Sequence, residues 1–237
     1  HHGEQAGEAV SAIFRAGFVP SAMELVEIDA LKIVSRFVDS NAVPVTDDTA
    51  AHLIIEVDGN NREVLMQDME AIGNLLAQYD IGEIYFADDA QQKAELWKLR
   101  RRVAEAVKMT GFTIEEDTVV PRAELPALIK GVKALGRKHD FEVVCYGHAG
   151  DGNLHIRIRK AGIPNSYENP EMNAVLRELF QLVKSLGGTI SGEHGVGLIQ
   201  KSYTDIVFDT ASLRLMREIK KAFDPNNILN AGKIFDL

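Results

Sequence analysis

Apolar residues recur at intervals of three and four in four stretches of the chain. This spacing places them on one side of a helix and predicts helices over residues 65–76, 96–107, 125–135 and 172–186. The first follows a turn at Asp58-Gly59-Asn60. The last ends at Gly187-Gly188, because glycine readily adopts the conformation that ends a helix.

Shorter apolar runs lie between these helices and predict strands. They cover residues 53–57, 83–87, 118–120, 142–146 and 154–159. In the last run, apolar residues from Leu154 alternate with polar residues from His155, which is the period of a strand with one buried face. This order indicates an α+β fold: a ferredoxin-like layer domain with a mainly antiparallel sheet, helices on one face and a C-terminal helical tail.

Composition narrows the functional classes. The 237 residues carry a net charge of −9, which argues against nucleic acid and anionic membrane surfaces as partners. The sequence contains no apolar run near the roughly 20 residues that cross a bilayer. Its single cysteine, Cys145, lies in an apolar run and is expected to be buried. Without a disulfide or a recognisable signal peptide, we expect a cytoplasmic protein, with membrane association only through partner subunits.

The sequence predicts a single domain. Residues 1–3, His-His-Gly, resemble the remnant of a purification tag, which leaves residues 4–237 as the domain. Neither a glycine-rich dinucleotide fingerprint nor a phosphate-binding loop motif is present in the sequence.

Two glycine-rich segments carry the candidate chemistry. Residues 146–155 read Tyr-Gly-His-Ala-Gly-Asp-Gly-Asn-Leu-His, and residues 191–197 read Ser-Gly-Glu-His-Gly-Val-Gly. If the first segment joins two strands, His148 and His155 converge, and Glu193 adds a carboxylate. Two histidines and a carboxylate with open positions suit a catalytic Zn²⁺, Fe²⁺ or Mn²⁺. The simpler alternative is that each histidine is a hydrogen-bonded polar group in a strand.

His194 is interpreted as a base. Because adjacent side chains diverge on most backbones, His194 is not expected to share an ion with Glu193. A neutral imidazole near a metal-bound hydroxyl can instead accept its proton. Asp151 precedes a glycine and is interpreted as a turn former.

Three consecutive arginines, residues 100–102, lie on the second predicted helix. At least two are expected on a solvated face, in ion pairs with Glu95 and Glu105. One could turn inward and bind a carboxylate through two hydrogen bonds.

Two other functional classes stay open. The same ligands could serve a metallohydrolase that uses a bound water, or the chain could be a non-catalytic subunit that binds an electron-transfer partner. The glycine-rich turns disfavour the second, because an interface seldom needs such permissive backbone.

Four motifs resemble the C-terminal region of FAD-linked 2-hydroxyacid dehydrogenases, the glycolate oxidase D-subunit and D-lactate dehydrogenase group of the vanillyl-alcohol oxidase superfamily. They are the two glycine-rich segments, residues 116–122 (Glu-Asp-Thr-Val-Val-Pro-Arg) and residues 223–233 (Phe-Asp-Pro-Asn-Asn-Ile-Leu-Asn-Ala-Gly-Lys). The resemblance runs from about Glu4 to the C-terminus. It implies that a separate N-terminal domain holds the FAD, so that the chain is expected to be a fragment that is inactive alone.

The resemblance also implies roles for single residues. The two histidines and Glu193 hold a divalent metal in those members that use one, and His194 is the base. Asn153 is a substrate contact and Arg100 the anchor for the substrate carboxylate. Asn230 lies near the flavin or the substrate.

The implied reaction is oxidation of a small D-2-hydroxy acid to the 2-keto acid. Relatives that act on a longer diacid tend to carry a lysine at Glu115 and a threonine at Ala104, so a monoacid such as lactate or glycolate is expected. The expected partners are this substrate, the FAD-binding domain and an electron-transfer subunit. The surface that the FAD-binding domain would cover is expected to let two isolated chains pair as a homodimer.

Overall fold

The computed structural model describes residues 2–38 and 43–237. In this part of the chain, five antiparallel strands form one sheet in the order β2-β1-β4-β5-β3. The strands are β1 (Ala22–Glu27), β2 (Ala51–Glu56), β3 (Ile114–Val119), β4 (Glu142–His148) and β5 (Asn153–Arg159). The sheet and the helices around it confirm the expected α+β class with an antiparallel sheet.

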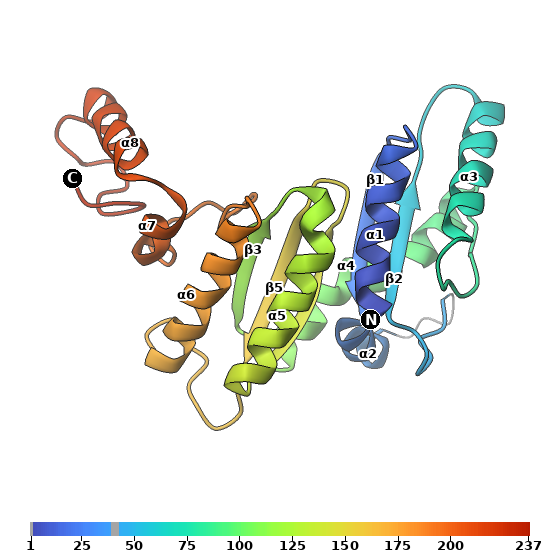
Figure 1. Ribbon diagram of the computed structural model, residues 1–237, viewed down its shortest axis with the longest axis horizontal. Coiled ribbons are helices and arrows are strands. Elements are labelled where there is room, and N and C mark those ends of the chain that lie inside the picture. The colour runs from blue at the N-terminus through green and yellow to red at the C-terminus, as the bar shows by residue number, and fades with distance from the viewer. Residues whose placement is uncertain (1, 39–42) are drawn as a thin grey trace.

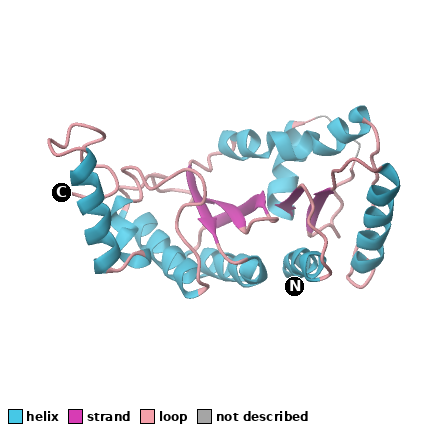
Figure 2. Ribbon diagram, turned by 90° about the horizontal axis from the view of Figure 1, so that it is seen from above, coloured by secondary structure: helices cyan, strands magenta, loops and turns pink. Residues whose placement is uncertain are grey.

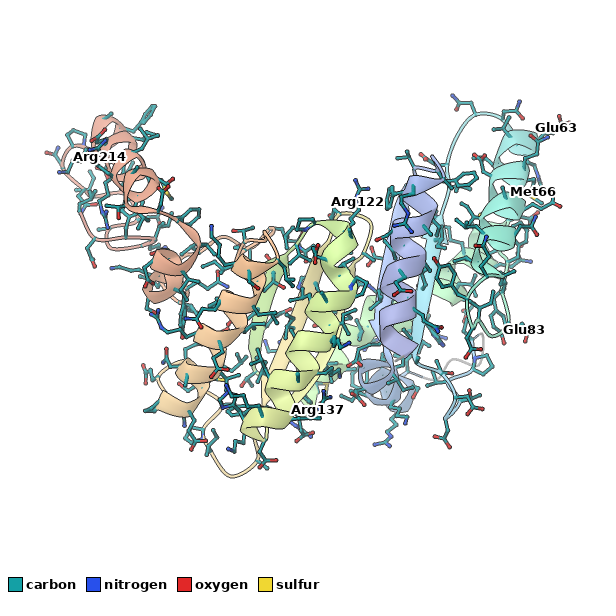
Figure 3. The ribbon with its side chains drawn as sticks, viewed as in Figure 1. Glu63, Met66, Glu83, Arg122, Arg137 and Arg214 are labelled. Atoms are coloured by element: carbon teal, nitrogen blue, oxygen red, sulfur yellow. The ribbon has the colours of Figure 1, made fainter. Side chains whose placement is uncertain are left out.

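The four helices that the apolar spacing predicts are present. They are α3 (Arg62–Leu76), α4 (Ala90–Met109), α5 (Leu125–His139) and α6 (Pro170–Ser185). The other helices are α1 (His2–Arg15), α2 (Ile28–Phe37), the short α7 (Thr204–Val207) and α8 (Thr210–Phe223), with 3₁₀ turns at residues 122–124 and 201–203. Figures 1 and 3 show an elongated molecule with α8 and its Arg214 at one end, and α3 with Glu63 and Met66 at the other.

Helices cover both faces of the sheet, whereas the sequence predicted helices on one face (Figure 2). On one face, α1, α5 and α6 bury residues such as Leu25 and Ile156. On the other, α2 and α4 bury Val26, Val144 and their neighbours. The helices α2 and α4 can cover this second face because β1 and β4 carry apolar side chains on both sides, which is typical of central strands.

The strand predicted at Glu83–Ala87 is wrong. Residues 80–88 form no strand, and the ladder of β2 is made with β1. Tyr85 and Phe86 instead line a groove beside β2, together with Trp97 of α4. Phe86 remains 47% exposed, so the segment contributes side chains to the wall of the groove without adding its backbone to the sheet.

The start of the chain leaves the tag prediction untested. His1 lies outside the described residues, and the backbone of the next two residues belongs to α1. Within the described ranges, no helix combines the length and apolar character that a bilayer crossing requires.

Cys145 is fully buried in β4, as its apolar surroundings predict. Burial raises the pKa of its thiol to about 12. The thiolate is therefore absent at neutral pH, and Cys145 acts as a small core residue.

Glu116 is a buried carboxyl group on the face covered by α5 and α6. Its side chain is 0% exposed and its Oε2 accepts a hydrogen bond of 2.6 Å from Nε2 of Gln200. Burial raises the pKa of Glu116 from 4.5 to about 8, although the hydrogen bond from Gln200 opposes the shift. At neutral pH the folded protein therefore holds this group protonated.

The substitution Glu116→Gln is expected to flatten the pH dependence of stability. Between pH 4.5 and about 8 the unfolded chain loses the Glu116 proton while the folded chain keeps it. The free energy of unfolding of the wild type therefore falls as pH rises through this window. Urea unfolding from pH 5 to 8 measures the slope, with the exposed Glu70→Gln as control. Equal slopes for Glu116→Gln and the wild type would contradict the assignment.

Candidate metal and substrate site

The hairpin of β4 and β5 brings the two predicted histidines together. His148 lies opposite Asn153 in the ladder, and the ring centroids of His148 and His155 are 5.9 Å apart. The strands close tightly at Gly147, where a Cβ atom would lie 2.5 Å from the carbonyl oxygen of Asn153. Glycine is therefore required at this position if the two imidazoles are to face the same side of the sheet.

Glu193 completes the predicted set of three ligands. One ligand atom from each of His148, His155 and Glu193 lies within 4.8 Å of the others. The three come from β4, β5 and the loop after residue 190. Two imidazoles and one carboxylate in this arrangement could hold a divalent transition metal and leave positions open for a substrate.

His155 has the properties of a ligand. Its side chain is 9% exposed, and burial lowers its pKa to about 4, so the ring is neutral with a free lone pair at pH 7. Its buried Nδ1 has no hydrogen-bond partner among the described residues; the nearest carboxylate oxygen, on Glu115, is 3.5 Å away. A neutral buried imidazole with incomplete hydrogen bonding fits a metal-binding position.

Asp117 of β3 holds the loop that carries Glu193. Its Oδ2 accepts hydrogen bonds from the amides of Gly192, Glu193 and His194 at 3.0, 2.8 and 2.9 Å. Its Oδ1 accepts a bond of 2.8 Å from Nδ2 of Asn153. Burial tends to raise the pKa of Asp117, but these hydrogen bonds outweigh it, and the pKa lies below its ordinary value. One ionised carboxylate therefore fixes three consecutive residues of the loop.

His194 lies beside this set of ligands. Its ring centroid is 5.5 Å from that of His155, and its side chain is 52% exposed. The expectation that its side chain diverges from that of Glu193 is wrong, because Nε2 of His194 is 3.9 Å from Oε1 of Glu193. The loop continues through Gly195, whose φ of +79° is a conformation that favours glycine.

Arg100 is the inward-facing member of the arginine cluster. Its Nη2 lies 2.7 Å from a carboxylate oxygen of Glu24, and its side chain is 12% exposed. Arg102 pairs with Glu105, as expected for a solvated face, whereas Arg101 stacks over Trp97. Glu95 pairs with Lys98 and with neither of these arginines.

Glu24 joins Arg100 to the histidines. Its other oxygen, Oε1, accepts a hydrogen bond of 2.6 Å from Nδ1 of His148. This bond is the main cause of a raised pKa for His148, against the opposing effect of burial. Sequence reasoning missed Glu24, because a glutamate in an unpredicted strand gives no local sign of its partners.

Of the remaining predicted residues, Asn153 lies within the site, whereas Asn230 lies outside it. Asn153 donates a hydrogen bond to Asp117, the residue that holds the loop. Asp151 accepts a bond of 3.0 Å from the amide of Asn153, which confirms it as a turn former. Asn230 is exposed in the C-terminal segment, with φ of +49°, and bonds to Lys233. Among the described residues, Asn230 forms no hydrogen bond with the two histidines.

Comparison with known proteins identifies the family of this chain. The family model described as FAD linked oxidases, C-terminal domain, matches residues 2–234. The fold resembles 4-ethylphenol oxidase from Gulosibacter chungangensis, with a TM-score of 0.62 and 16% identity over 96% of this chain and 50% of that one. At this identity the likeness supports the fold alone.

Relatives by sequence include glycolate oxidase subunit GlcD of Bacillus subtilis, 33% identical over 98% of this chain and 48% of the relative. D-lactate dehydrogenase of Anaerostipes hadrus is 29% identical over 95% of this chain and 48% of its own length. D-2-hydroxyglutarate dehydrogenase of Stutzerimonas stutzeri is 32% identical over 81% and 42%. The chain thus spans about half the length of these relatives. With a family model that matches nearly all of it, the chain belongs to the family of C-terminal domains of FAD linked oxidases.

Proposed function

We propose that this chain is the substrate- and metal-binding part of a flavin-dependent enzyme that oxidises a small D-2-hydroxy acid to the 2-keto acid. The observation that carries the proposal is the meeting of His148, His155 and Glu193 in one place, with His194 beside them. The names of the relatives, which act on glycolate, D-lactate and D-2-hydroxyglutarate, support a 2-hydroxy acid as substrate.

Each residue has a distinct part in the proposed reaction. A divalent metal held by the two histidines and Glu193 would supply Lewis acidity that lowers the pKa of a substrate hydroxyl. FAD, which family membership implies, would supply the acceptor for the C2 hydrogen, which leaves as a hydride with two electrons. His194 accepts the hydroxyl proton, because its half-exposed ring lies next to the ligands. Arg100 orients the substrate carboxylate, and Asn153 is a further contact with the substrate.

The charges around the ligands favour a monoacid. Glu115 lies 3.5 Å from His155 and forms an ion pair with the buried Arg157. Arg157 also donates from Nε to the hydroxyl of Tyr146 at 3.0 Å, so its charge and donors are already engaged. A second substrate carboxylate on the Glu115 side of the site would therefore meet a negative charge whose cation, Arg157, is already engaged, which disfavours diacids relative to lactate or glycolate.

The apolar surface of the C-terminal segment supports a further proposal, that it packs against the FAD-binding half present in the relatives. None of the residues of α8 is buried. Large apolar side chains are exposed here at Leu198, Ile199, Leu215, Ile219, Phe223, Ile228 and Leu229. So many exposed apolar side chains in one segment are typical of a protein interface. Because GlcD is named as a subunit, an electron-transfer subunit is a further proposed partner.

Removing either histidine ligand is expected to abolish metal binding. The wild type, prepared without His1 and His2 and loaded with Zn²⁺ or Mn²⁺, should retain about one ion per chain after dialysis. His148→Ala and His155→Ala should retain less than a tenth of that, because two remaining ligands hold a divalent ion weakly. Elemental analysis measures the content.

A histidine outside the site provides the matched control. His52 of β2 contacts the carbonyl oxygen of Pro44 at 3.3 Å, and His52→Ala should retain the ion. Equal metal content in the two site variants and the wild type would contradict the metal site. Hydrolysis of an ester by the metal-loaded chain alone would instead favour a metallohydrolase.

A further inference from the structure

Glu24 is a buried carboxylate at the centre of the sheet. It lies on β1 directly opposite His148 of β4, and its side chain is 7% exposed. A carboxylate removed from water needs strong partners, because an unpaired buried charge is costly. Glu24 has two such partners, and they are residues with two different proposed roles.

The first partner is the ligand His148. Oε1 of Glu24 lies 2.6 Å from Nδ1 of the imidazole, so this nitrogen carries the proton and donates it to the carboxylate. The lone pair of the neutral ring is then left on Nε2. Carboxylates that bind the far nitrogen of a histidine ligand fix both its tautomer and its orientation.

The second partner is Arg100 of α4. Its Nε and Nη2 lie 2.8 and 2.7 Å from the same oxygen, Oε2. The Nε edge of the guanidinium is therefore engaged by Glu24, and Nη1 is the nitrogen that Glu24 leaves for a ligand. The ion pair also fixes the direction in which Arg100 points.

We infer that Glu24 is a positioning residue, which sets His148 for a divalent cation and Arg100 for a carboxylate from one buried side chain. This inference rests on the proposed function, since it concerns the same ligands. It adds a residue that neither the sequence motifs nor the ligand set include, and it makes the two halves of the substrate site depend on each other.

The test compares Glu24→Gln with a matched ion pair on the same sheet. Glu142 of β4 accepts from Nε and Nη2 of Arg159 at 2.9 and 2.7 Å, but is 53% exposed and lies at the far end of the strand. Competition with a chromophoric chelator gives the dissociation constants for Zn²⁺ and Mn²⁺. Glu24→Gln should bind about 10- to 100-fold more weakly than the wild type, and Glu142→Gln equally well.

A second variant removes Glu24 without leaving the buried charge of Arg100 unpaired, which could itself prevent folding. Glu24→Met with Arg100→Met removes the carboxylate and its buried cation together, so no charge is left unpaired. Nitrogen-15 NMR of the metal-free protein at pH 8 reports the tautomer of His148. The wild type should show the proton on Nδ1, whereas the double variant should show a mixture of both tautomers.

The two measurements separate the inference from the proposed function. If both Glu24 variants bind the ions as tightly as the wild type and keep the tautomer, the positioning role is wrong while the metal site stands. If the wild type binds neither ion, the metal site is wrong. In that case a tautomer that changes in the double variant still supports the positioning of His148 by Glu24, and an unchanged tautomer overturns it.

Discussion

Replacing His194 with alanine is expected to lower kcat by about 10²- to 10⁴-fold, the usual contribution of a general base. The measurement requires a protein in which this chain is joined to the proposed FAD-binding domain, assayed with D-lactate and with glycolate. Metal content should stay at the wild-type level, because His194 lies outside the three ligands whose atoms gather within 4.8 Å. The variant thus separates proton transfer from metal binding.

The comparison variant for this prediction is again His52→Ala, which changes an imidazole on β2 and should keep kcat within about twofold. Unchanged kcat in His194→Ala would place the base elsewhere. A fall in kcat accompanied by loss of the metal would instead show that His194 is a metal ligand. This outcome is tested because Nε2 of His194 lies 3.9 Å from Oε1 of the ligand Glu193.

Replacing Asp117 with alanine is expected to affect both stability and metal binding. Three loop amides and Asn153 lose their acceptor, and hydrogen bonds to a charged group contribute about 1.5–3 kcal/mol each. Because the loop is half-exposed and water replaces part of what is lost, a net cost of about 3 kcal/mol is expected in urea unfolding. Metal affinity should fall by about 10- to 100-fold as Glu193 loses its fixed position.

Asp224 provides the control for this effect. It also accepts two backbone amides, those of Ile228 and Leu229 at 3.0 and 2.9 Å, but in the C-terminal segment. Asp224→Ala should lower stability and leave the dissociation constant for the metal unchanged. Equal metal affinity in Asp117→Ala and Asp224→Ala would show that the hydrogen bonds from the loop to Asp117 do not position Glu193.

Apolar periodicity predicted four of the helices but not α2, although its buried Ala30, Leu31 and Val34 also lie on one side of the helix. The four predicted helices each present one apolar side to the core or to a groove, which is the pattern that periodicity detects. Strand β1 was missed because Glu24 and Glu27 interrupt its apolar residues, and both glutamates are buried through specific partners. The run at residues 83–87 has a strand's composition, yet its side chains line a groove.

The same reasoning explains which site residues could be predicted. The proximity of His148, His155 and Glu193 could be predicted because histidines and a glutamate beside glycine turns are a local signal. Asp117 appeared only within a family motif, and Glu24 did not appear at all, because the function of each depends on contacts with distant residues. Glu24 and His148 are 124 positions apart, and Asp117 reaches across 75 to 77 positions to the loop.

These long separations determine when the site can exist during folding. The hairpin of β4 and β5 is local, so its two histidines can meet early. Their orientation and the place of Glu193 depend on β1 and β3, which must first join the two sides of that hairpin. A chain with an incomplete sheet therefore offers a metal only scattered donors, and a cation bound at the proposed site would mark a molecule in which β1, β3, β4 and β5 have all assembled.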